Sequence, residues 1–154
     1  MKQATLCLLM KEGKILLAMK KRGFGMGRWN GVGGKPQNDE TMEATTVREA
    51  EEEIGVKIKT EHLEKVAELD FFFPNKKEWN QTVHVFLAKN WEGDPIESEE
   101  MKPSWFNHAD IPFDQMWPDD MHWLPAVLSG KKLKGEFHFS DDGDTIGDFS
   151  IKEI

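Results

Sequence analysis

The sequence contains one cysteine, Cys7, and no tyrosine. A single cysteine cannot form a disulfide within the chain, so the expected setting is a reducing, cytoplasmic compartment. Cys7 lies in an apolar run, which favours a small core residue over a nucleophile. No apolar run approaches the ~18–20 residues that span a bilayer, and the N-terminal apolar stretch is broken by charges. We therefore expect neither a membrane span nor a secretory leader.

Basic residues are also in the minority, with 20 Lys and Arg against 28 Asp and Glu, for a net charge of −8. This balance argues against binding to nucleic acid polymers or anionic membranes, and it favours a monomer. It does not argue against a phosphate-bearing small molecule, provided that a local positive charge such as a metal ion is present.

The 154 residues include ten Phe and six Trp, enough for one domain spanning residues 1–154. Alternating and apolar runs predict strands over residues 3–10, 14–20, 64–73, 82–90 and 103–107, and a hairpin over 135–151 that turns at Asp141–Asp144. Helices are predicted over residues 41–54 and 119–128, and a glycine-rich loop over 21–39. The mixture indicates an α+β or α/β class with a mixed sheet.

The stretch REAEEEIGV, Arg48–Val56, places four glutamates in five positions. On a helix, Glu49, Glu52 and Glu53 share one face, and Glu51 points to solvent. The apolar positions form a separate stripe: Val47, Ala50 and Ile54. Three carboxylates beside a buried face repel one another unless something neutralises them. A solvated helix face is one interpretation, and a Mg²⁺ site is the other, because Mg²⁺ favours a few carboxylates plus substrate phosphates.

The loop before this helix ends in Gly33, Gly34 and Lys35. Glycines let the backbone approach a ligand closely, and can offer a carbonyl to a metal or N–H groups to a phosphate. From Gly34 to Val56 the chain reads G-x5-E-x7-R-E-U-x-E-E-x-G-U, where U is a small or aliphatic apolar residue. This pattern matches the Nudix box at every defined position, so the chain resembles the Nudix family.

The resemblance implies an α/β/α sandwich, in which a mixed sheet lies between helices and the box forms a loop, a helix and a loop. It implies hydrolysis of a diphosphate linked to another moiety, with Mg²⁺ or Mn²⁺ as cofactor. Glu49, Glu52 and Glu53 would hold the metal, and a glutamate or a hydroxide would be the base. Arg48 would pair with a neighbouring glutamate and orient it.

Four further stretches resemble the animal branch of the family that hydrolyses oxidised purine nucleoside triphosphates: KKRGFGMGRWNGVGGK, VHVF, ESEEMKPSWF and IPFDQMWPDD. The metal ligands implied by this resemblance are Gly33, Glu49, Glu52, Glu53 and Glu100. The residues implied to hold the base are Asn30, Trp117, Asp119 and Asp120. Those implied to line the pocket or approach the substrate are Thr5, Lys20, Phe24, Phe71, Phe73 and Phe139, with Gly33, Gly34 and Lys35 in the adjoining loop.

The residue types fit this role. Trp117 offers a broad face for stacking on a purine, although core packing also explains a tryptophan. Asp119 and Asp120 could serve as an N-cap and a first-turn acid. In an apolar pocket, however, two adjacent carboxylates do not both ionise readily, so one can keep a proton and donate while the other accepts. Such a pair could recognise both oxidised guanine and oxidised adenine.

Other functions remain open at this point. The segment Pro74–Gln81 departs from the animal pattern, which leaves the order of substrate preference undetermined. Alternatives are a Nudix hydrolase for ADP-ribose or a dinucleotide, or a non-catalytic domain that binds a nucleotide. A diphosphate isomerase is disfavoured because the cysteine and glutamate arrangement for that chemistry is absent from the sequence.

Overall fold

The structure is a computed structural model that describes residues 1–141 and 143–154. Its strands are β1 (Lys2–Lys11), β2 (Lys14–Lys20), β3 (Trp29–Asn30), β4 (Leu63–Phe72), β5 (Gln81–Ala88), β6 (Met101–Asn107), β7 (Leu133–Phe139) and β8 (Ile146–Glu153). Its α-helices are α1 (Met42–Ile54) and α2 (Asp120–Leu128), and short 3-10 turns connect several elements. The predicted helices and the longer strands are therefore present, with ends that differ by one or two residues.

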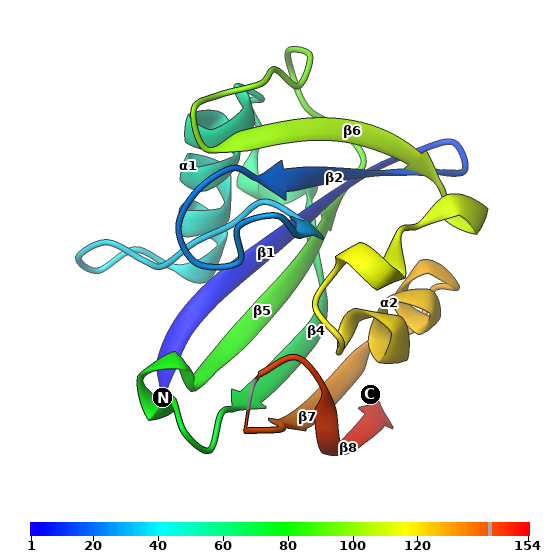
Figure 1. Cartoon of the computed structure of the whole chain (residues 1–154). Helices are drawn as coiled ribbons and strands as arrows, with labels where there is room; N and C mark the ends of the chain where they lie inside the picture. The colour runs from blue at the N-terminus through cyan, green and yellow to red at the C-terminus, as the bar shows by residue number, and fades with distance from the viewer. Residues whose placement is uncertain (142) are drawn as a thin grey trace.

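The strands pair in the order β3-β2-β1-β5-β4-β7-β8, and β6 pairs with β2. β1 runs parallel to β5, and β4 runs parallel to β7, whereas the other pairs are antiparallel. Figure 1 shows β1 and β5 side by side through the centre of the molecule, with α1 and α2 well apart. The mixed sheet predicted from the sequence is confirmed.

One face of β1 packs against α1. Cys7 and Leu9 are almost fully buried, and they share a core cluster with Ala50 and Ile54 of α1. Val47 packs at the margin of the same cluster. The predicted apolar stripe of α1 thus faces the sheet, which leaves the glutamate face free for other roles.

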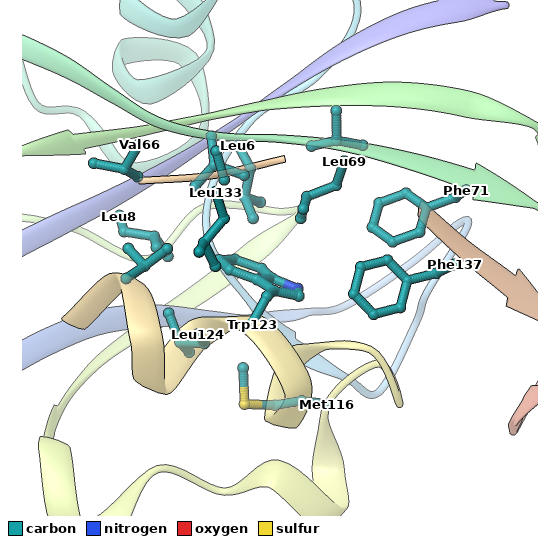
Figure 2. Close-up of a cluster of buried hydrophobic side chains, with 14 of the residues drawn as sticks. Leu6, Leu8, Val66, Leu69, Phe71, Met116, Trp123, Leu124, Leu133 and Phe137 are labelled. Carbon is teal, nitrogen blue, oxygen red and sulfur yellow. The ribbon is translucent and has the colours of Figure 1, made fainter. Parts of the chain in front are cut away.

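The opposite face of β1 packs against α2. Leu6 and Leu8 alternate with the residues that face α1, as the period of two in a strand requires. They belong to a second, larger core cluster with Trp123 and Leu124 of α2, which Figure 2 shows. Because β1 is buried on both faces, the sheet lies between the two helices, as the resemblance implied.

Helix α1 has well-defined ends. The Thr41 side chain accepts a hydrogen bond from the N–H of Ala44 at 3.0 Å, which satisfies one free donor of the first turn. Gly55 ends the helix in the left-handed conformation with φ of 74°, and its N–H donates to the carbonyl of Glu51. Local sequence signals therefore suffice to set the limits of this helix.

One region differs from the sequence predictions. The glycine-rich loop contains the two-residue strand β3, which exists only because Met19 and Ala18 of β2 pair with Trp29 and Asn30. Of the turn predicted at Asp141–Asp144, residue 142 lies outside the described residues. Among the described helices, none is long and apolar enough to cross a membrane.

Candidate active site

The glutamates of α1 lie at different depths. Glu53 is buried, Glu49 is half-buried, and Glu52 and Glu51 are exposed. Glu49, Glu52 and Glu53 line one hollow of about 220 Å³, whereas Glu51 does not. The hollow therefore separates Glu49, Glu52 and Glu53 from Glu51, in line with their positions around the helix. Glu100 lines the same hollow, across from α1, and we call it the glutamate hollow.

Arg48 organises one side of this hollow. Its guanidinium donates two hydrogen bonds to the carboxylate of Glu40, from Nε at 2.8 Å and Nη2 at 3.0 Å. Its Nη1 donates to Glu49 at 2.9 Å and to Glu52 at 3.2 Å. The Arg48 guanidinium holds the pKa of Glu40 down at about 2. Arg48 thus fixes the loop to the helix and orients Glu49, as predicted.

Among the glutamates of α1, Glu53 has surroundings that compensate a negative charge poorly. Its Oε1 accepts a hydrogen bond from the N–H of Gly33 at 3.1 Å, but its buried Oε2 has no hydrogen-bond partner. Burial, followed by the neighbouring carboxylate of Glu49, raises the pKa of Glu53 to about 8. A buried acceptor oxygen without a donor is a site for a cation or a proton.

Gly33 and Gly34 are required by close packing. A Cβ added to Gly33 would lie 1.9 Å from the carbonyl oxygen of Thr5, and one added to Gly34 would lie 2.5 Å from Oε1 of Glu49. The N–H of Thr5 donates to the carbonyl of Gly34 at 2.8 Å. These glycines therefore let the loop pass between β1 and the glutamate face of α1.

The carboxylates of the hollow are held by arginines. Arg48 binds Glu49 and Glu52, and Nη2 of Arg22 lies 3.3 Å from Oε1 of Glu100. Within residues 1–141 and 143–154, no three acidic, His or Cys side chains are gathered into a coordination shell. The donor chemistry nevertheless fits a hard divalent ion, because the hollow offers five carboxylates, one of them the buried Glu53 with its unpartnered Oε2.

A larger cavity of about 540 Å³ adjoins the glycine loop and extends to α2; we call it the base pocket. The structure brings together here every residue that the sequence assigned to substrate binding. These are Thr5, Lys20, Phe24, Asn30, Gly33, Gly34, Lys35, Phe71, Phe73, Trp117, Asp119, Asp120 and Phe139. Because Glu53 bonds to the backbone of Gly33, the glutamate hollow and the base pocket meet at this glycine.

Asp119 and Asp120 form the polar part of the pocket and are both buried. Oδ2 of Asp119 accepts a hydrogen bond from Nε1 of Trp123 at 2.7 Å, whereas buried Oδ2 of Asp120 has no partner. Asp119 makes no side-chain hydrogen bond as an N-cap. The alternative that these residues serve as ordinary helix caps is therefore not supported.

Burial dominates the electrostatics of this pair. It raises the pKa of Asp119 to about 6, partly opposed by the hydrogen bond from Trp123. It raises the pKa of Asp120 well above its ordinary value, and the adjacent charge of Asp119 acts in the same direction. Arg28 lowers both values but does not offset burial. Burial therefore favours a neutral carboxyl in this pair, which would give one side chain that donates a hydrogen bond and one that accepts.

Trp117 forms an aromatic wall of the cavity that this pair also lines. Phe24 stacks on it with ring centroids 5.1 Å apart, and the guanidinium of Arg28 lies 4.2 Å from its ring centroid. The edges of Phe73 and Phe139 also approach it. Trp117 is half-buried and lines the cavity, so it offers surface to a flat ligand and is not solely a core residue.

The sequence did not single out several residues of the pocket, among them Arg28, Trp79 and Trp123. Trp123 follows Asp119 by four positions on a predicted helix, a spacing that could have indicated their contact. Arg28 and Trp79 reach the pocket from other segments, and no local pattern marks them. Gln81, in the segment that departs from the animal pattern, also lines the pocket.

Comparison with known families assigns the class. The family model described as "NUDIX domain" matches residues 1–127, more than half of the chain. The chain therefore belongs to the NUDIX family. Its fold is also that of a solved structure, the MutT protein of Bacillus halodurans, with a TM-score of 0.81, 23% identity, and coverage of 99% of this chain and 98% of that one.

Two curated relatives are similar over nearly their whole length. The oxidized purine nucleoside triphosphate hydrolase of Mus musculus is 47% identical over 150 residues, which cover 97% of this chain and 94% of the mouse protein. The protein with the same name from Danio rerio is 45% identical, with coverage of 99% and 96%.

Proposed function

We propose that the protein hydrolyses oxidised purine nucleoside triphosphates to the monophosphate and pyrophosphate, and so removes damaged precursors from the nucleotide pool. The NUDIX domain supplies the reaction class, and the mouse and zebrafish relatives carry this activity in their names. The observation that carries the choice of substrate is the buried pair Asp119 and Asp120, which lines the same cavity as Trp117.

The base pocket suits a modified purine. A flat base can pack against Trp117, and its polar edge can face Asp119 and Asp120. The protonated aspartate donates a hydrogen bond and the ionised one accepts. Oδ1 of Asn30 accepts from the N–H of Gly31 at 2.9 Å, so its amide NH₂ serves as a further donor. Because the proton can reside on either aspartate, the pair can match either oxidised guanine or oxidised adenine.

The phosphates would lie towards the glycine loop and the glutamate hollow. Glu49, Glu52, Glu53 and Glu100, with the carbonyl of Gly33, are the groups that would hold Mg²⁺ or Mn²⁺. A divalent ion supplies charge neutralisation for the phosphate oxygens, which phosphoryl transfer requires. Lys20 lines the cavity and its charge acts on Glu53, so it is placed to attract the phosphates.

The residues of the chain itself prepare the hydrolysis. Arg48 holds Glu49 and Glu52 in place through its Nη1. Glu53 is held by the Gly33 N–H and lies among carboxylates, where it can hold or release a proton near neutral pH. We propose Glu49, Glu52 and Glu53 as the catalytic and metal-binding residues, with Arg48 positioning them.

The test is pyrophosphate release with Mg²⁺ over a panel of 8-oxo-dGTP, 2-hydroxy-dATP, O6-methyl-dGTP, dGTP, dATP, ADP-ribose and a diadenosine polyphosphate. A strong preference for the modified purine triphosphates is the expected result. A preference for ADP-ribose or the dinucleotide would contradict the base-pocket assignment and leave the family chemistry intact. No turnover of any substrate would favour a nucleotide-binding domain.

We further propose that residues 1–154 act as one domain and as a monomer in a reducing, cytoplasmic compartment. The net charge of −8 opposes self-association. Cys7 is buried, and burial raises the pKa of its thiol to about 12, so it is inert to oxidative pairing. Light scattering that gave a mass near 17.7 kDa, with no change under oxidising conditions, would support this assignment.

A further inference from the structure

Trp79 lies at the rim of the base pocket and has no role in the proposed reaction. It ends the short 3-10 turn Lys77–Trp79 in the connection between β4 and β5, and its half-buried side chain lines the cavity. It is the one tryptophan of this connection.

Four aromatic rings form a closed circuit at this rim. Trp79 contacts Phe24 edge-to-face at 4.9 Å between centroids, and Phe73 edge-to-face at 5.5 Å. Phe24 stacks on Trp117 at 5.1 Å, and Phe73 approaches Trp117 at 6.4 Å. All four distances fall in the range that aromatic pairs prefer. Within the circuit each ring contacts two others, and the circuit joins three segments of the chain: the glycine-rich loop, the β4–β5 connection and the segment before α2.

Phe24 depends on these neighbours for its position. It is 46% exposed, and it lies among three glycines at positive φ, Gly23, Gly25 and Gly27. Glycines in such a loop give the backbone little intrinsic preference for one conformation. Contacts with Trp117 and Trp79 therefore set where the ring of Phe24 sits.

Trp79, in contrast, is firmly anchored. The N–H of Phe73 donates to Oδ1 of Asn80 at 2.7 Å, the N–H of Trp79 donates to the carbonyl of Lys76 at 2.8 Å, and Nζ of Lys2 donates to the carbonyl of Glu78 at 2.8 Å. The turn is thus tied to both β4 and β1. A fixed ring beside a loosely held ring can position it.

We propose that Trp79 is a positioning residue for base recognition, which holds Phe24 against Trp117 and so fixes the outer aromatic wall of the base pocket. The proposal rests on the proposed function, since it assigns Trp79 to the affinity for the purine. It predicts an effect on base binding and none on the chemistry at the glutamate hollow, because Trp79 does not line that hollow.

The test compares kinetics of 8-oxo-dGTP hydrolysis in the wild type, Trp79→Ala and Trp79→Phe. We expect Trp79→Ala to raise KM about 3–10-fold, the equivalent of one lost aromatic pair, with kcat within about twofold of the wild type. Inhibition by inorganic tripolyphosphate, which has no base, should be unchanged. Trp79→Phe keeps a ring at the contact and should recover KM to within about twofold.

The matched control is Trp91→Ala. Trp91 is also half-buried and stacked on another tryptophan, Trp105 at 5.9 Å, but it lines neither cavity. Its KM should stay at the wild-type value. Because Trp79 is proposed to act through Phe24, the double variant Phe24→Ala/Trp79→Ala should have the KM of Phe24→Ala alone. The proposal is overturned if the rise in KM of the double variant is the product of the two single rises. It is also overturned if kcat of Trp79→Ala falls by as large a factor as KM rises.

Failure of this inference can be told apart from failure of the proposed function. If the wild type does not hydrolyse 8-oxo-dGTP, the proposed function fails, and the variants are then compared by titration with 8-oxo-dGMP. An unchanged Kd in Trp79→Ala overturns the role of Trp79. A wild type that does not bind the monophosphate either overturns both.

Discussion

The protein has two clusters of carboxylates that meet at Gly33, and it manages their charge in different ways. In the glutamate hollow, Arg48 binds Glu49 and Glu52 directly. In the base pocket, Asp119 and Asp120 are buried, and neither forms an ion pair within the described part of the chain. Arg48 balances Glu49 and Glu52, whereas burial raises the pKa values of Glu53 and of the aspartate pair and so favours their protonated forms.

This difference matches two tasks. Carboxylates that stay accessible and oriented by an arginine are suited to a divalent ion and to phosphates. Carboxylates that burial keeps partly protonated are suited to hydrogen bonding with the edge of a neutral base. The two clusters therefore use the same functional group, and an ion pair with Arg48 distinguishes Glu49 and Glu52 from the buried aspartates.

The largest expected effect is a loss of kcat when a glutamate of the hollow is changed, with base binding retained. Glu53→Gln keeps the acceptor for the Gly33 N–H but removes the charge, so we expect kcat to fall about 10²–10⁴-fold while the Kd for 8-oxo-dGMP stays within about threefold. Glu51 is exposed and lies two positions before Glu53 on α1, so Glu51→Gln should change neither kcat nor Kd. A Glu53→Gln variant that retained more than a tenth of the wild-type kcat would remove Glu53 from the catalytic group.

The next effect is on stability, and it concerns the aspartates alone. Both pKa values are raised by burial above the ordinary 3.8, that of Asp119 to about 6 and that of Asp120 well above its ordinary value. At pH values between the unfolded and folded pKa values, the folded chain binds more protons than the unfolded chain does. The pair therefore lowers the free energy of unfolding as pH rises through about 4 to 6 and above.

Asp120→Asn removes this cost. We expect a Tm above that of the wild type at pH 8, by about 2–4 °C for each kcal/mol of stability recovered, and no difference near pH 4. Thermal unfolding at pH 4, 6 and 8 measures it. A difference of the same size at every pH would mean that Asp120 is not protonated through burial.

Asp120→Asn should also change the preference between the two oxidised purine substrates. An asparagine at position 120 cannot exchange a proton with Asp119, so it should favour one base over the other. We expect the ratio of kcat/KM for 8-oxo-dGTP and 2-hydroxy-dATP to change by about 10-fold, the equivalent of one hydrogen bond in a buried site. Equal losses on both substrates would indicate general damage to the pocket.

The smallest effect tests the cation beside the base pocket. Arg28→Met keeps the aliphatic volume but removes the guanidinium that lies on Trp117 and donates to the carbonyl of Met116. One cation–π contact of about 0.5–1 kcal/mol predicts a rise in KM of about 2–5-fold with kcat unchanged. A fall in kcat with KM unchanged would mean that Arg28 acts in hydrolysis, and would contradict its assignment to base binding.

Local patterns were enough to predict the glutamate cluster. Thr41 and Gly55 mark the ends of α1, and the spacing of the glutamates on a helix places Glu53 and Glu51 on different sides. Burial of the apolar stripe then fixes the orientation of the helix, so the sequence alone places the acids. The family resemblance supplied the residues of the base pocket, all of which line the cavity.

Residues that act across segments could not be predicted in the same way. Oδ2 of Asp119 accepts from Trp123, where local rules suggested a helix cap, because burial leaves the indole N–H in need of an acceptor. Arg28 and Trp79 reach the pocket only when loops distant in sequence come together. Strand β3 likewise depends on pairing with β2.

The parallel pairing of β1 with β5 and of β4 with β7 also orders the assembly of the enzyme on the ribosome. The segment that bears the glutamates is complete at residue 54, but β1 gains its parallel neighbour only after Ala88 has emerged, and the wall that contains Phe139 arrives last. Contacts over such long separations close late in folding. A growing chain therefore carries the glutamates of α1 long before the cavity lined by Phe139 can form.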